Sequence, residues 1–123
     1  MPTKFVDNAG NELMISLSYG LIRSIRNETG IDVSNPNDIP KLLYSQADMI
    51  QFAFCAMRSK LNQLNISEVE FEKNLEGENT FHELSEAVLT ELANFTERFG
   101  QKPLAGHIRG AIKAIQEMKA TES

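Results

Sequence analysis

The sequence contains no tryptophan, a single cysteine and only two histidines. One cysteine excludes a disulfide bond within the chain. Cys55 stands in an apolar stretch, residues 52–57, where a thiol behaves as a small core group. Because no neighbouring histidine or helix start favours its thiolate, we expect Cys55 to be buried and unreactive.

The two histidines lack the partners that a metal site requires. His82 and Glu86 are four residues apart and could share one face of a helix. A zinc site needs three or four ligands, however, and the His-Glu-x-x-His pattern is absent. We interpret His82 as a solvated side chain near the start of a helix, and His107 as an exposed one. No metal is expected.

Several functional classes are not indicated by any motif. The sequence has no phosphate-binding loop and no serine-centred nucleophile motif, and residues 68–78 form an acidic run that is typical of a solvated helix face. No stretch approaches the roughly 20 apolar residues of a membrane span, and the start lacks the pattern of a signal peptide. We therefore expect a cytoplasmic protein that is not an enzyme, with no cofactor and no membrane partner.

The charge is unevenly distributed along the chain, whose net charge is −5. Acidic side chains dominate residues 31–97, whereas residues 98–123 carry an excess of lysine and arginine. Solvated helix faces of unequal charge explain this pattern, and it also suits head-to-tail association. Nucleic-acid binding needs a stronger basic face, so a helix-turn-helix over residues 93–119 remains only a weaker alternative.

The start of the chain has the pattern of a hairpin followed by a helix. Residues 7–11 favour a tight turn. Leu13, Ile15 and Leu17 then alternate with other side chains, which predicts a strand with one buried face. Gly30 stands where a glycine commonly ends a helix. Such a hairpin must pack against helices or pair through an open edge.

Helical spacing and capping signals divide the remainder into helices. A connector with two prolines, residues 31–40, is predicted to be a loop that leads into one short turn over residues 41–44, and a helix is predicted from Ser45 to about Leu64. Ser67 and Thr80 each begin a capping box, so two further helices are expected after them. The apolar face of the first of these three helices is predicted to contain Ala47, Ile50, Phe54, Met57 and Leu61.

Together these patterns predict an α+β fold, mostly helical, with an N-terminal β-hairpin packed on a bundle of about four helices. The chain is long enough for one core, so residues 1–123 are expected to form a single domain. Within it, residues 1–30 supply the hairpin and first helix, residues 45–100 the central helices, and residues 104–119 the C-terminal helix.

The C-terminal helix is the candidate partner-binding element. Its apolar stripe includes Ile108, Ile112 and Ile115, and its basic side chains, among them Arg109, oppose the acidic middle of the chain. Glycine recurs at positions 106 and 110, which permits the close approach of another helix. Two arrangements remain open: the helix folds back on its own domain, or it docks on a neighbour or another protein.

Five stretches carry a family resemblance. The first runs from Phe5-Val6-Asp7 through Gly10-Asn11 to Leu17, and the second is Ile22-Arg23 through Thr29-Gly30-Ile31-Asp32-Val33. The other three are Leu42-Leu43-Tyr44, Ile66 to Leu75, and Ala87 through Glu91-Leu92 to Phe95. In this order they resemble the hairpin, first helix and later helices of tail assembly chaperones of bacteriophages and prophages. The family's later helix often ends in a Phe-Pro segment, whereas here residues 95–100 intervene before Pro103.

This resemblance implies a binding protein inside the host cell that holds an aggregation-prone tail component, such as the tape measure protein. It implies tail proteins (tape measure or tail tube) as partners, possible homo-oligomers, and no catalytic residues. A structural virion subunit, associated with the head–tail joint or the tail tube, is the alternative. A small nucleic-acid-binding regulator is a third and weaker one.

Overall fold

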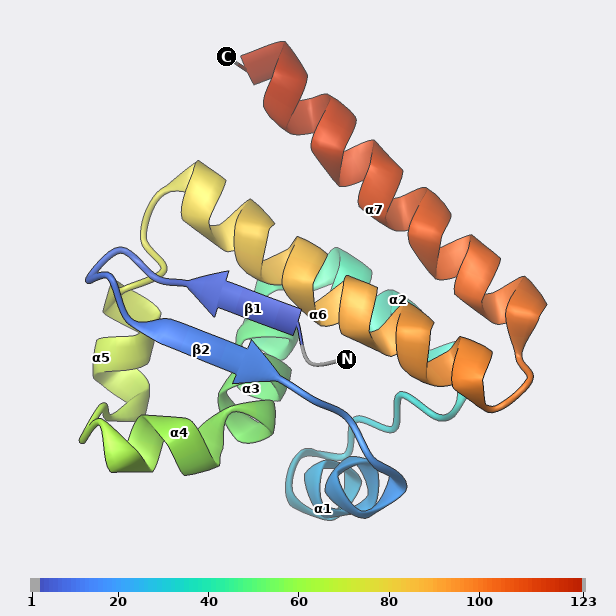
Figure 1. Cartoon of the computed structure of the whole chain (residues 1–123), viewed down its shortest axis with the longest axis horizontal. Helices are drawn as coiled ribbons and strands as arrows, with labels where there is room; N and C mark the ends of the chain where they lie inside the picture. The colour runs from blue at the N-terminus through green and yellow to red at the C-terminus, as the bar shows by residue number, and fades with distance from the viewer. Residues whose placement is uncertain (1–2, 123) are drawn as a thin grey trace.

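The chain begins with an antiparallel hairpin that has one apolar face (Figure 1). The structure is a computed structural model that describes the backbone of residues 3–122, and all of their side chains except those of residue 78 and residues 119–122. Strand β1 (Thr3–Val6) pairs with β2 (Glu12–Ile15), and Phe5 stands opposite Leu13. Leu13 and Ile15 are fully buried, whereas Met14 is exposed. The predicted alternation is confirmed.

Helix α1 (Tyr19–Thr29) follows the hairpin and has a side-chain cap at its start and a glycine at its end. The hydroxyl of Ser18 accepts a hydrogen bond from the N–H of Leu21 at 3.2 Å. Gly30 adopts a left-handed φ of 82°, which glycine reaches without steric cost, and its N–H donates to the carbonyl of Arg26. The predicted glycine stop is therefore confirmed.

The connector after α1 is more helical than expected. A short 3-10 helix (Pro36–Asp38) leads directly into α2 (Ile39–Tyr44), so the loop predicted over residues 31–40 is only partly a loop. Pro36 and Pro40 both lie in the first turn of a helix, where the missing proline N–H has no intrahelical partner to lose. The prolines therefore start helices here.

The continuous helix predicted from Ser45 to Leu64 is wrong. The structure has α3 (Gln46–Ala56) and α4 (Arg58–Gln63), which are separated at Met57. Met57 has a ψ of 10°, outside the helical range, and its side chain is buried. The bend places α4 against β2, with Leu61 fully buried. The contact between α4 and the hairpin therefore accounts for the bend that divides the predicted helix in two.

The predicted apolar face of this segment is confirmed only in part, because Met57 and Leu61 are buried and Phe54 is half-buried against the core. Within α3, Ala47 is exposed and Ile50 is only half-buried, and the buried side chains are instead those of Met49, Phe52, Ala53 and Cys55. The segment is apolar on most of its circumference, so its periodicity does not identify one inward face.

Three helices complete the chain: α5 (Glu68–Lys73), α6 (Glu78–Arg98) and α7 (Lys102–Glu122). The cap predicted at Ser67 is confirmed, because its hydroxyl accepts from the N–H of Glu70. The cap predicted at Thr80 is wrong. Helix α6 begins three residues earlier than a cap at Thr80 would place it, with Gly77 as its N-cap, and the Thr80 hydroxyl donates to Asn8 of the hairpin turn instead.

Helix α6 lies at the centre of the molecule (Figure 1). The hairpin packs against α6 and α4, and α7 packs along α6. Leu84, Val88 and Leu92 of α6 are fully buried in the core. The structure is therefore a mostly helical α+β fold with an N-terminal hairpin packed on helices, as the sequence predicts.

Candidate functional site

The four residues predicted to bind a partner lie on α7, which folds back on its own chain. Ile108 is only 3% exposed, because it packs in the interface with α6. Arg109 forms an ion pair with Glu97 of α6, while Ile112 and Ile115 are half-buried against the core. Packing within the chain therefore occupies Ile108. The role of Ile108, Arg109, Ile112 and Ile115 in binding a partner stays a prediction.

The glycines of α7 lie on the outer side of this helix. Gly106 and Gly110 are exposed, and apart from the adjacent residues and the backbone of α7 itself, no atom of the described residues lies within 4 Å of the position that a Cβ would take on either glycine. The close approach that these glycines permit is therefore not used to pack α7 on α6.

Helices α6 and α7 diverge away from the turn that joins them (Figure 1). Between the start of α6 and the C-terminal half of α7 lies a groove of about 350 Å³, with α2 along one side. We call it the apolar groove. Its principal lining residues are Leu43, Tyr44, Phe81, Leu89, Ile115 and Met118. Among the described residues that line it, none carries a carboxylate, a lysine or an arginine.

Three side chains on the groove expose much of their apolar surface to solvent. Tyr44 is 87% exposed, Met118 48% and Leu43 37%. Tyrosine presents a large, rather rigid apolar surface, and methionine adapts its shape to irregular partners. Apolar side chains that gather at a groove, rather than standing singly, are typical of a protein-binding surface.

His82 lies at one end of the apolar groove and is not the fully solvated side chain that we expected. The residue is half-buried, and its Nδ1 atom is buried without a hydrogen-bond partner among the described residues. The periodicity of α6 alone does not reveal this burial, because α2, α3 and α7 supply the other walls. His107, in contrast, is exposed as predicted.

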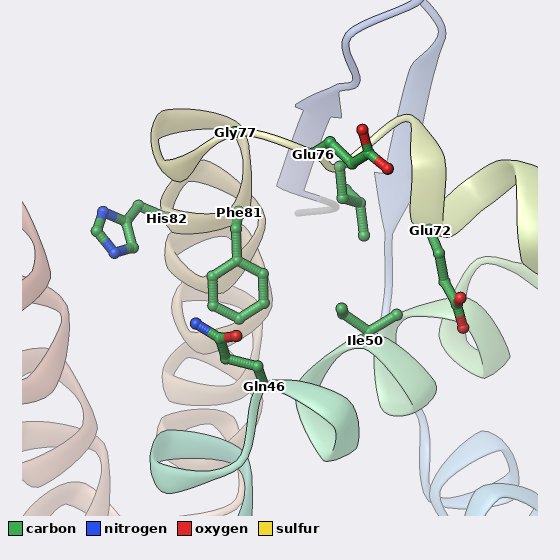
Figure 2. A pocket seen from close by; sticks show the side chains of 8 residues that line it. Gln46, Ile50, Glu72, Glu76, Gly77, Phe81 and His82 are labelled. Atoms are coloured by element: carbon green, nitrogen blue, oxygen red, sulfur yellow. The ribbon is translucent and has the colours of Figure 1, made fainter.

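A second depression adjoins the apolar groove (Figure 2). It has a volume of about 370 Å³ and lies between α3, α5 and the start of α6. Ile50, Leu75 and Phe81 supply its apolar surface, and Glu72 and Glu76 stand at its side. We call it the acidic cleft. Gln46, Phe81 and His82 line both depressions, so the two are continuous neighbours.

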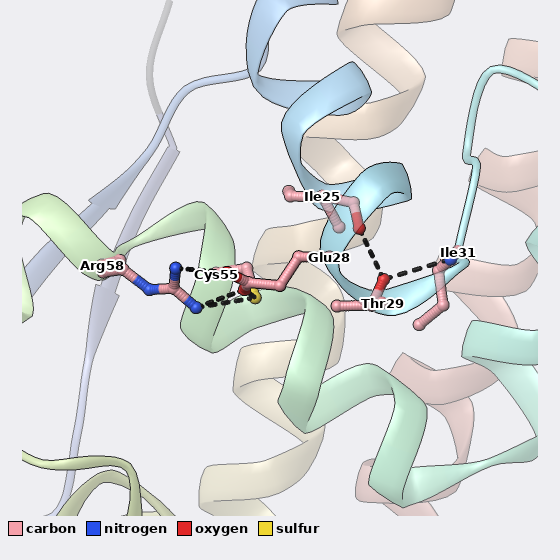
Figure 3. Close-up of polar contacts among 6 residues, drawn as sticks. All are labelled: Ile25, Glu28, Thr29, Ile31, Cys55 and Arg58. Atoms are coloured by element: carbon pink, nitrogen blue, oxygen red, sulfur yellow. Dashed lines mark hydrogen bonds and ion pairs between the residues drawn. The ribbon is translucent and has the colours of Figure 1, made fainter.

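The only cysteine belongs to a polar cluster elsewhere in the molecule (Figure 3). The Cys55 thiol donates to Oε2 of Glu28 at 3.0 Å, and Nη1 of Arg58 donates to Oε1 of Glu28 at 2.7 Å. Burial, together with the Glu28 carboxylate, raises the pKa of Cys55 to about 12. The predicted burial of Cys55 is confirmed, and its thiol is a poor nucleophile at neutral pH.

The same cluster fixes the end of α1. The hydrogen bonds from Arg58, and secondarily from Cys55, lower the pKa of Glu28 to about 2. One residue later, the Thr29 hydroxyl donates to the carbonyl of Ile25 at 2.8 Å and accepts from the N–H of Ile31 at 3.1 Å. These contacts serve the fold: those of Glu28 join α1 to the bend after α3, and those of Thr29 close the end of α1.

Within residues 3–122 the side chains described include no group of three or more histidines, cysteines, aspartates or glutamates placed to hold a metal ion. None of the helices in that part of the chain is both long and apolar enough to cross a membrane.

No protein-family model, no curated protein and no solved structure matches this chain. The likeness to phage tail assembly chaperones therefore rests on the sequence features given above.

Proposed function

We propose that this chain is a tail assembly chaperone-like binding protein of a bacteriophage or prophage. It holds an apolar helical segment of an aggregation-prone tail protein, such as the tape measure protein, and performs no catalysis. The observation that carries the proposal is the apolar groove between α2, α6 and α7, with Leu43, Tyr44 and Met118 exposed around it. The ordered resemblance of the hairpin and helices supports the identity of the client.

The shape of the groove fits a helix better than an extended strand. Helical side chains form its walls, and an amphipathic helix lays side chains of one face into such a groove at spacings of three and four residues. A strand would instead need an open sheet edge for its backbone hydrogen bonds, and the groove has none among its described lining residues.

The test compares two single substitutions, one of a residue that lines the groove and one of an equally exposed residue outside it. Leu43 and Leu64 are exposed to 37% and 38%, but only Leu43 lines the groove. We expect Leu43→Asp to reduce client binding at least tenfold, because the carboxylate loses water when the client docks. Leu64→Asp should bind normally. The measurement is the amount of soluble tape measure protein of the same phage or prophage that co-purifies with each variant after co-expression.

Circular dichroism and thermal melting of both variants separate lost binding from lost folding. Undiminished binding by a folded Leu43→Asp variant would contradict the proposal.

A structural virion subunit is the second candidate, and the hairpin favours it. Strands β1 and β2 pair with each other, so in the described part of the chain each has an outer edge without a strand neighbour. Val6 and Met14 are 40% and 48% exposed on the outer face. Such an edge suits a ring of identical subunits. Stoichiometric amounts of the chain in purified particles would favour this candidate over the chaperone.

A further inference from the structure

Three neighbouring depressions share Gln46 as a lining residue, and their linings differ in charge. The apolar groove has no charged lining residue among those described, whereas the neighbouring acidic cleft has Glu72 and Glu76. A third depression of about 460 Å³ continues from the cleft along α3 and α5, and it adds Glu68. The negative charge is therefore concentrated at one end of a continuous surface.

The carboxylates of this surface are not paired within the protein. Glu68, Glu72 and Glu76 are exposed, and among the described residues their side chains form no hydrogen bond or ion pair. Other surface carboxylates of the chain do form such pairs: Glu28 with Arg58, and Glu97 with Arg109. The acidic end thus offers three carboxylates that an outside cation can reach.

Apolar side chains line the same depressions as these carboxylates. Ile50 and Phe81 are half-buried and line the acidic cleft, and Ala47 is exposed in the third depression. Figure 2 shows Ile50 and Phe81 beside Glu72 and Glu76. A partner that covers this surface must bring apolar contacts and positive charge together.

We propose that the occupant of this surface is an amphipathic helix with basic residues at one end. Its apolar face lies in the apolar groove, and its lysine or arginine side chains lie over the acidic cleft, near Glu72 and Glu76. This inference rests on the proposed function and specifies the chemistry of the client segment. It also sets the direction of the helix, because the groove itself has no charge for the basic end to meet.

Designed peptides test the inference directly. The first is a fluorescently labelled helical peptide with a leucine stripe and lysines at one end, and the second has glutamates in place of these lysines. Fluorescence anisotropy gives the affinity of each peptide for the full chain at low and at physiological ionic strength. We expect the lysine peptide to bind about tenfold more tightly, with a difference that shrinks as salt is added.

Two double variants, each of which removes two negative charges, then show which carboxylates bind the lysine peptide. Glu72→Gln with Glu76→Gln should weaken binding of the lysine peptide roughly threefold to tenfold, because exposed ion pairs contribute modestly. Glu70→Gln with Glu83→Gln removes the same charge from exposed residues that do not line the cleft, and it should leave the affinity nearly unchanged.

The inference is overturned if both peptides bind equally, if neither binds, or if the two double variants weaken the lysine peptide to the same extent. Peptide binding to the Leu43→Asp variant distinguishes a wrong assignment of the basic end from a groove that binds no helix at all. Equal binding of both peptides that is lost in Leu43→Asp would retain the groove as a docking site and reject only the basic end. The co-expression experiment with the tape measure protein judges the proposed function independently.

Discussion

Glu91 is a carboxylate in the interior of the protein. Its side chain is 1% exposed, and its Oε1 atom has no hydrogen-bond partner among the described residues. The Arg98 guanidinium lies 4.0 Å from Oε1, at the limit of an ion pair. Burial raises the pKa of Glu91 above its ordinary value of 4.5, and the Arg98 charge only partly offsets this. The charged form of Glu91 is therefore a cost to the fold at neutral pH.

The substitution Glu91→Gln tests this cost. A folded-state pKa above the unfolded one means that Glu91 contributes its full stability below pH 4.5 and loses it as the pH rises through the folded value. We expect Glu91→Gln to be more stable than the wild type by about 1 kcal/mol at pH 8, and the advantage should shrink toward pH 4. Urea denaturation at several pH values measures it, with Glu83→Gln as the exposed control. An advantage independent of pH would reject this account.

Single residues were predictable from the sequence where local context decides their environment. The burial of Cys55 follows from its apolar neighbours, but its bond to Glu28 joins residues 27 positions apart and has no sequence signal. The apolar groove was missed for the same reason. Ile115 was among the predicted residues, whereas Leu43 and Tyr44 reach the groove only because α2 packs beside α6 and α7.

At the scale of elements, α7 consists of two parts with different roles. Its first half contributes Ala105 and Ile108, which are 0% and 3% exposed, to the interface with α6. Its second half contributes Ile115 and Met118 to the apolar groove. The C-terminal helix is thus both a core element and a wall of the candidate site. From the sequence, folding back on its own domain and docking on another protein stood as alternatives.

Ending the chain at Gly110 separates these two roles. The truncated chain keeps Ala105 and Ile108 but loses Ile112, Ile115 and Met118. We expect it to fold with a stability lowered by roughly 2–4 kcal/mol, because it loses half-buried apolar side chains, and to lose client binding. Ending the chain at Gly100 should instead unfold it. Denaturation and co-purification with the tape measure protein measure both effects. A chain ending at Gly110 that binds the client normally would exclude α7 from the site.

The ends of helices could not be predicted from the sequence where contacts with distant residues outweigh the local capping signals. The chain has no proline or glycine near Met57, so nothing local predicts the bend that brings α4 against β2. Thr80 has the sequence of a helix cap, but its hydroxyl bonds Asn8 and the helix starts after Gly77. Ser18, Ser67 and Gly30, which lack such competing partners, begin or end their helices as local rules require.

At the scale of the whole molecule, hydrogen bonds join the first turn of the chain to its middle. Asn8 donates through its side chain to the carbonyl of Glu76 at 2.6 Å, and its N–H donates to the carbonyl of Asn74 at 3.0 Å. Asp7, in the same turn, accepts from the N–H groups of Ala9 and Asn11 at 3.0 and 2.9 Å. The hairpin turn is therefore fixed to the segment between α5 and α6, beside the acidic cleft.

Asp7→Ala should loosen this whole arrangement. Asp7 is only 5% exposed, so its loss leaves the N–H groups of Ala9 and Asn11 without an acceptor. We expect a destabilisation of roughly 2–4 kcal/mol. Glu12→Ala, which removes an exposed ion pair with Lys4, should cost well under half as much. Because the turn holds the α5–α6 segment, hydrogen exchange in Asp7→Ala should rise at residues 74–77 as well as in the hairpin. A rise confined to the hairpin would show that the turn does not order the middle of the chain.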